Sequence, residues 1–154
     1  MKTITFNLHR GDSFISKQIM KRSNGNFSHV SNDMGDFVFE SVEGKGTIIT
    51  NKLAWDSRTV VESYAIEVSD RKYEQLVAWS KEQEGKKYDY WGVIAHISSW
   101  FAKPRMGKWY CSELSFVMLA KIKGILGDDI SMQKVSPHLF RVFLQMNPKA
   151  KRVR

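Results

Sequence analysis

The stretch Trp109-Tyr110-Cys111-Ser112-Glu113-Leu114 contains the only cysteine of the chain. Apolar residues that follow it predict an amphipathic helix from Ser112 to about Ile125. A thiol at a helix N-terminus lies beside unpaired backbone N–H groups that favour negative charge, and the thiolate is the nucleophilic form of cysteine. The alternative is a buried apolar cysteine, which is the commoner fate of this residue type. The choice depends on whether the chain supplies a suitable base.

The length and composition indicate one globular domain that spans residues 1–154. Hydrophobic residues make up 42% and charged residues 26% of the 154-residue chain. A single cysteine excludes an internal disulfide and a cysteine-rich zinc site. The N-terminus has no apolar signal segment, and no stretch approaches the roughly 18 uninterrupted apolar residues of a membrane span. We therefore expect a cytoplasmic protein without a transmembrane segment, and a phage or viral origin is compatible with this expectation.

The net charge of +8 raises the question of an anionic partner. Basic residues gather at 17–22, at 103–108 and in a basic tail at about 148–154. No helix-turn-helix, zinc-finger or single-strand-binding aromatic motif accompanies them, so no specific nucleic-acid partner is predicted. The loop 103–108, just before the cysteine, would suit an anionic substrate. The sequence does not indicate an oligomeric state.

Strands and turns dominate the first half of the chain, and helices dominate the second. The expected strands are 1–8, 27–31, 37–42, 47–50 and 59–68, with a hairpin connection at 32–36. The expected helices are 13–22, one capped by Asp70 and stopped by Gly85, 91–101, 112–125 and one opened by Ser136-Pro137. This order predicts an α+β fold, in which a small antiparallel sheet packs against helices and leaves a cleft at its end.

Among the four histidines, His29 is the best candidate for a general base. It lies in a short strand, and a rigid strand aims an imidazole reproducibly. His96 falls in an apolar helix, which favours a core or interface position. His138 follows a proline in the first turn of a helix, where a surface position is expected. His9 precedes a turn and could contact substrate, although nothing in the sequence requires it.

A cysteine–histidine pair needs a third group that orients the imidazole, and Glu40 is the leading candidate. It ends the apolar run 37–39, on the strand expected to pair with that of His29. A surface carboxylate at a strand end is the equally weighted alternative. Three other acidic residues nearby are expected in turns: Asp33, Asp36 and Glu43. Glu113 is expected in the first turn of the helix, where a carboxylate pairs favourably with the helix dipole.

Other kinds of chemistry find little support in the sequence. It contains no glycine-rich phosphate loop, no His-Glu-x-x-His pair and no nucleophile-elbow serine. Asp12, Asp33 and Asp36 are too scattered to argue for a metal site. We therefore expect neither a metal nor a cofactor.

Several short motifs occur in an order found in a known superfamily. They are Gly11-Asp12, Phe27-Ser28-His29-Val30, Phe39-Glu40-Ser41, Tyr110-Cys111-Ser112-Glu113-Leu114, the segment 85–90 and Ser136-Pro137. The chain resembles the circularly permuted branch of the NlpC-type papain-like superfamily, in particular YiiX/YebB-like hydrolases, with lecithin–retinol acyltransferase-like proteins as more distant relatives. The polar run 31–33 departs from the longer apolar strand of that family, so the histidine strand is expected to be short.

The resemblance implies a permuted papain-like fold with Cys111 as nucleophile, His29 as base and Glu40 as orienting residue. It also implies a cysteine hydrolase or acyltransferase that acts on an amide or ester through a thioester. Candidate substrates are a cell-wall peptide or a lipid-type N-acyl or ester compound. The alternative is a catalytically inactive binding or structural module, for example of a virion, that retains a papain-like cleft and a basic surface.

Overall fold

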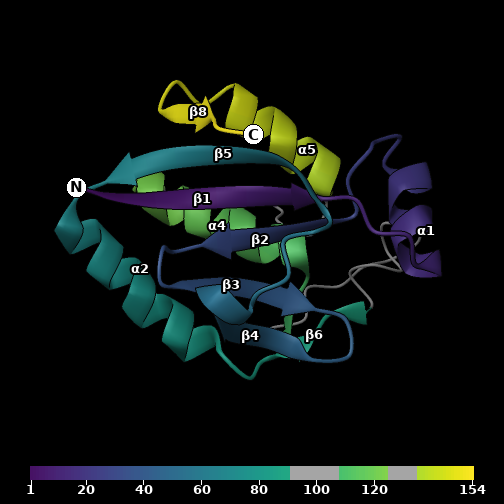
Figure 1. Cartoon of the computed structure of the whole chain (residues 1–154), viewed down its shortest axis with the longest axis horizontal. Helices are drawn as coiled ribbons and strands as arrows, with labels where there is room; N and C mark the ends of the chain where they lie inside the picture. The colour runs from purple at the N-terminus through teal and green to yellow at the C-terminus, as the bar shows by residue number, and fades with distance from the viewer. Residues whose placement is uncertain (91–107, 125–134) are drawn as a thin grey trace.

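The computed structural model describes residues 1–90, 108–124 and 135–154. Its main element is a six-stranded sheet with antiparallel neighbours in the order β4-β3-β2-β1-β5-β8 (Figure 1). The strands are β1 Lys2–His9, β2 His29–Asp33, β3 Phe37–Val42, β4 Gly46–Asn51, β5 Val60–Val68 and β8 Ala150–Arg152. A separate parallel pair joins β6 (Lys87–Tyr88) to β7 (Lys108–Trp109).

Four α-helices are present in the described part of the chain, which confirms the predicted α+β class. They are α1 Phe14–Arg22, α2 Asp70–Gln83, α4 Cys111–Lys123 and α5 Pro137–Gln145, and a short 3-10 helix, η1 Lys52–Ala54, follows β4. Helix α4 lies behind the sheet, α1 lies at one end of it, and α5 lies beside β5 (Figure 1). None of the described helices is long and apolar enough to cross a membrane.

The alternation of residues along β1 separates the two faces of the sheet. Ile4, Phe6 and Leu8 are fully buried and belong to the same core cluster as Leu114 and Met118 of α4. Residues between them in sequence point to the opposite face, because successive side chains of a strand alternate. That opposite face carries a row of buried polar residues, including Asn7, His9, Ser31 and Ser63.

Local capping explains where the helices begin. The side chains of Ser13, Ser69 and Ser136 each accept a backbone N–H in the first turn of α1, α2 and α5. Pro137 occupies the start of α5, as predicted. The prediction that Asp70 caps α2 is wrong by one residue, because Ser69 is the cap and Asp70 lies in the first turn.

The structure also corrects the predicted end of the histidine strand. The strand was expected to end at Ser31, with Asn32 and Asp33 in the hairpin connection, but β2 continues to Asp33. The polar side chains find partners there: the hydroxyl of Ser31 bonds to His9, and the side-chain amide of Asn32 donates to the carbonyl oxygen of Phe39 at 2.9 Å. These partners on neighbouring strands make the polar run compatible with a strand, although the side-chain oxygen of Asn32 is buried without a hydrogen-bond partner.

Two further segments differ from the prediction. The segment 86–90 was expected to be a polar link, yet Lys87 and Tyr88 form β6 against β7. Part of the basic tail forms β8, which pairs with β5 between Ala150 and Ile66 and between Arg152 and Tyr64. The predicted helix 91–101, His96 and almost all of the loop 103–108 lie outside the described residues.

Candidate active site

Cys111 is the first residue of α4, and hydrogen bonds from three segments fix the start of this helix. The hydroxyl of Ser41 in β3 donates to the carbonyl oxygen of Trp109 at 2.8 Å, and the backbone N–H of Asp89 donates to the same oxygen at 3.1 Å. The Glu113 carboxylate accepts the backbone N–H of Tyr110 at 3.2 Å. These contacts attach the N-terminus of α4 to the end of the sheet.

His29 is the first residue of β2, and its ring is held by Glu40 on β3. The distance from His29 Nε2 to Glu40 Oε2 is 2.7 Å. The other carboxylate oxygen, Oε1, accepts the indole N–H of Trp55 at 3.1 Å. The side chains of His29 and Glu40 are 24% and 9% exposed, so the pair is partly screened from solvent. Glu40 is therefore the partner of His29 and not a solvated strand-end carboxylate.

The electrostatics of His29 link it to the thiol. Burial lowers the pKa of His29, but interaction with Cys111, including a side-chain hydrogen bond, and with Glu40 raises the pKa to about 10. An imidazole with two such neighbours is held as an imidazolium at neutral pH. The structure thus brings Glu40 into contact with His29 and places Cys111 near enough to raise the pKa of His29.

A cavity of about 390 Å³ opens beside His29. His29, Glu40 and Trp55 contribute to its polar wall, and Ile15 and Ile19 of α1 contribute to its apolar wall. Cys111 is only 1% exposed and does not line this cavity. It packs instead in an apolar cluster with Ile19, Tyr88 and Tyr110, against which Ile15 lies. Ile15, Ile19 and Tyr88 therefore contribute both to this cavity and to the cluster around Cys111.

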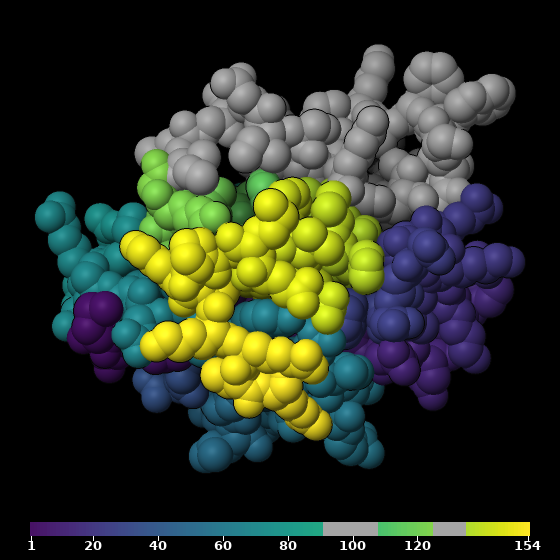
Figure 2. Space-filling model, turned by 90° about the horizontal axis from the view of Figure 1, so that it is seen from above, coloured from purple at the N-terminus to yellow at the C-terminus, as the bar shows by residue number. Residues whose placement is uncertain are grey.

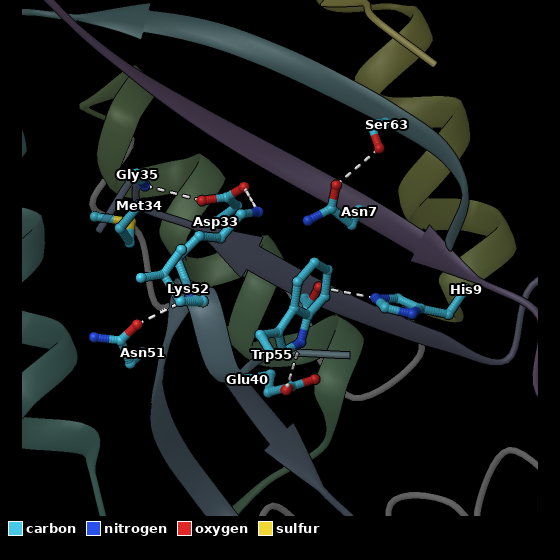
Figure 3. A network of polar contacts seen from close by, with 12 residues as sticks. Asn7, His9, Asp33, Met34, Gly35, Glu40, Asn51, Lys52, Trp55 and Ser63 are labelled. Carbon is cyan, nitrogen blue, oxygen red and sulfur yellow. Dashed lines mark hydrogen bonds and ion pairs between the residues drawn. The ribbon is translucent and has the colours of Figure 1, made fainter. Parts of the chain in front are cut away.

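Two residues that the sequence did not single out for the site belong to it: Trp55 and, as a buried neighbour, His9. His9 is 4% exposed and lies against His29, with ring centroids 5.0 Å apart. Figure 3 shows Trp55 between Glu40 and His9, with its indole bonded to Glu40. The position of His9 opposite His29 follows from strand pairing, but no local signal marks Trp55, which follows a short 3-10 helix.

The remaining candidates lie elsewhere. Asp33 forms an ion pair with Lys52 and accepts the backbone N–H of Gly35, so it is not a solvated turn residue. Asp36 and Glu43 are exposed, and Glu43 lines the rim of the cavity. His138 was expected at the surface, but its ring stacks against Phe27 at 6.3 Å and its Nδ1 is buried.

Glu113 was expected to pair with the helix dipole, and it does lie in the first turn of α4. It is 5% exposed. The pKa of Glu113 rises to about 7 because of burial and, to a smaller extent, the charge of Asp89, while the hydrogen bond from Tyr110 opposes them. Within the described residues, no three histidine, cysteine, aspartate or glutamate side chains gather into a set that could hold a metal ion.

The sequence was also compared with known proteins. No protein-family model matches the chain, and no curated protein matches it. The function proposed below therefore rests on the geometry of the site.

Proposed function

We propose that this protein is a cysteine hydrolase or acyltransferase that cleaves an amide or ester bond through a thioester on Cys111. The observation that carries the proposal is the contact of Glu40 with His29, whose Nε2 lies 2.7 Å from Glu40 Oε2, together with the influence of Cys111, which raises the pKa of the same histidine. A carboxylate, an imidazole and a thiol in this order provide an orienting group, a base and a nucleophile.

In the proposed reaction, the Cys111 thiolate attacks the substrate carbonyl carbon and forms a C–S bond. The backbone N–H of Cys111 has no acceptor within the helix, because it belongs to the first turn, and it can donate to the developing oxyanion. The His29 imidazolium then gives its proton to the leaving amine or alcohol as the C–N or C–O bond breaks. Water or another acceptor attacks the thioester, His29 takes the proton, and the thiolate is released.

The order of the elements supports a permuted papain-like arrangement. The base lies on β2 and its partner on β3, whereas the nucleophile begins α4, so the base precedes the thiol in the chain. A helix that carries the cysteine and packs against an antiparallel sheet fits that proposal. The apolar and polar walls of the cavity suit an acyl compound or a peptide equally, so both remain candidate substrates.

The burial of Cys111 favours the competing proposal of a binding module without catalysis, because an inaccessible thiol cannot attack a substrate. Incubation with p-nitrophenyl esters of short and long acyl chains, followed by intact-mass measurement, distinguishes the two. We expect an acyl adduct on the wild-type protein and none on Cys111→Ser. A wild-type protein that forms no adduct with esters or with acyl-peptide thioesters would support the binding module.

Alkylation by iodoacetamide tests the cysteine–histidine pair directly. An ordinary thiol with a pKa of about 8.5 is only about 3% ionised at pH 7. We expect His29→Ala to slow the alkylation of Cys111 at pH 7 several-fold, because it removes the imidazolium that would stabilise the thiolate. His138→Ala is the matched control, because it removes a histidine that does not contact the site. Equal rates in the wild-type protein and His29→Ala would exclude the pair.

A further inference from the structure

His9 lies directly beside the proposed base. It is the last residue of β1 and pairs with His29, the first residue of β2, in the antiparallel ladder. The two rings are 5.0 Å apart and inclined by 60°. The pairing of β1 with β5 shifts register between Leu8 and His9, and such bulges re-aim a side chain. The backbone therefore directs the His9 ring against that of His29.

Both nitrogen atoms of the His9 ring have hydroxyl partners. Nδ1 lies 2.9 Å from Thr59 Oγ1, and Nε2 lies 2.8 Å from Ser31 Oγ. A hydroxyl group can either donate or accept, so this pair matches a neutral imidazole, which has one N–H donor and one acceptor nitrogen. The two hydrogen bonds fix the His9 ring at opposite edges, and His9 is only 4% exposed.

The charges around His9 keep it neutral. The pKa of His9 falls to about 2, first because of burial and then because of the charges of His29 and Arg154, while Asp56 opposes them. No change of His9 charge is therefore expected across the pH range in which most proteins are folded. This matters for His29, because a second cation against its ring would oppose the imidazolium charge that Glu40 and Cys111 stabilise.

His9 also contacts the residue that holds Glu40. Its ring meets that of Trp55 edge to face, with centroids 5.7 Å apart and an angle of 88°. Trp55 in turn donates its indole N–H to Glu40 Oε1 at 3.1 Å (Figure 3). One buried ring thus packs against both His29 and the indole that orients the carboxylate partner of His29.

We propose that His9 is a positioning residue: a neutral imidazole, anchored by Ser31 and Thr59, that holds the His29 ring in the plane where it serves Glu40 and Cys111 together. This inference rests on the proposed cysteine–histidine chemistry, but the neutrality and anchoring of His9 are properties that can be measured without any substrate.

The variants His9→Phe and His9→Gln separate positioning from simple packing. Phenylalanine retains a ring and loses both hydrogen bonds, whereas the glutamine amide can still donate and accept. Ser63→Ala is the matched control, because Ser63 is another buried hydroxyl on this face of the sheet and bonds to Asn7 at 2.8 Å. The readouts are the alkylation rate of Cys111 and the ring-nitrogen NMR titration of His29, with urea unfolding in parallel.

We expect His9→Phe to lower the His29 titration midpoint by about one unit and to slow the alkylation of Cys111 measurably. His9→Gln should restore most of both, and Ser63→Ala should change neither. A His9→Phe protein that is destabilised but keeps the wild-type midpoint and rate would overturn the proposal, since His9 would then be only a core residue.

The ring-nitrogen spectrum of the wild-type protein provides a second test that requires no variant to fold. We expect His9 to show a single neutral tautomer from pH 5 to pH 9, and a His9 ring that titrates in this range would overturn the proposal. The two proposals fail differently. Loss of the His29 effect on alkylation contradicts the cysteine–histidine mechanism, whereas a His29 effect that persists unchanged in His9→Phe contradicts only the role of His9.

Discussion

At the scale of single residues, the site depends on how one imidazole shares its two nitrogens. Glu40 occupies one side of the His29 ring and Cys111 approaches it as a second partner, while His9 and Trp55 surround the pair. Sequence motifs marked Cys111, His29 and Glu40, but not Trp55. The chemistry arises because β1, β2 and β3 place His9, His29 and Glu40 on one face of the sheet at the end where α4 begins.

The first prediction concerns the charge of His29. Glu40→Gln removes a carboxylate that raises the pKa of His29, so we expect the titration midpoint to fall from about 10 towards the ordinary value. Because the pKa of His29 is higher in the folded than in the unfolded state, its protonation stabilises the fold. This stabilisation is fully present below about pH 6.5 and is lost as the pH rises through 10. The measurement is the ring-nitrogen NMR titration of His29 in both proteins.

The control for this prediction is Trp55→Phe, which keeps the carboxylate and removes only one hydrogen bond to it. We expect a smaller decrease of the His29 midpoint than in Glu40→Gln. An unchanged midpoint in Glu40→Gln would mean that Glu40 does not support the His29 charge.

At the scale of elements, the start of α4 contains a carboxylic acid that burial keeps partly neutral. The raised pKa of Glu113, about 7, means that the folded state binds this proton more tightly than the unfolded state. The resulting stabilisation is fully present below about pH 4.5 and is lost as the pH rises through 7. We expect Glu113→Gln, which keeps an acceptor oxygen for Tyr110, to raise the free energy of unfolding at pH 8 by about 1–3 kcal/mol.

Urea unfolding at pH 4.5 and at pH 8 measures this effect. The two proteins should differ little at the lower pH, where the carboxylic acid and the amide are both neutral. A stabilisation of equal size at both pH values would show that the ionisation of Glu113 is not its cause.

Helix α1 covers the nucleophile, and Ile19 is its main contact. Ile19 is 5% exposed and packs in the cluster of Cys111, Tyr88 and Tyr110. We expect Ile19→Ala to increase the rate of Cys111 alkylation and to lower the free energy of unfolding by about 2–4 kcal/mol, because it opens a cavity above the thiol. Phe14→Ala on the same helix is the control, since Phe14 is 76% exposed. A slower alkylation in Ile19→Ala would contradict this covering role.

The elements also show what the sequence can and cannot predict. Alternating apolar residues located β1 and β5, and Ser136-Pro137 located the start of α5. The extension of β2 through Asn32 and Asp33 was missed, because the contacts that accommodate this polar run come from His9 and from the backbone of Phe39 on other strands. Such partners are far apart in sequence, so local patterns do not reveal them. Trp55 escaped attention for the same reason.

At the scale of the whole molecule, the C-terminus completes the sheet and does not remain a free basic tail. The C-terminal residues form a broad part of the surface seen in Figure 2. Strand β8 pairs with β5, where Glu62 meets Arg141 of α5 at 2.8 Å and Arg152 of β8 at 3.6 Å. The charge pattern alone raised the question of an anionic partner for this tail. In the fold, β5 offers the tail both a strand edge, which β8 pairs with, and the carboxylate of Glu62.

The Glu62–Arg141 pair provides the last prediction. The side chain of Glu62 is 11% exposed, and it accepts hydrogen bonds from Arg141 and from the Tyr64 hydroxyl. Arg141→Met leaves this carboxylate without its closest cation, so we expect the free energy of unfolding to fall by about 2 kcal/mol. Adding Glu62→Gln should recover part of the loss, because the remaining group is then neutral.

The exposed pair of Arg58 and Asp56 provides the control, and Arg58→Ala should leave the urea midpoint unchanged. If Arg141→Met and Arg58→Ala both left the free energy of unfolding nearly unchanged, the attachment of α5 and β8 to β5 would depend on apolar packing and backbone pairing alone.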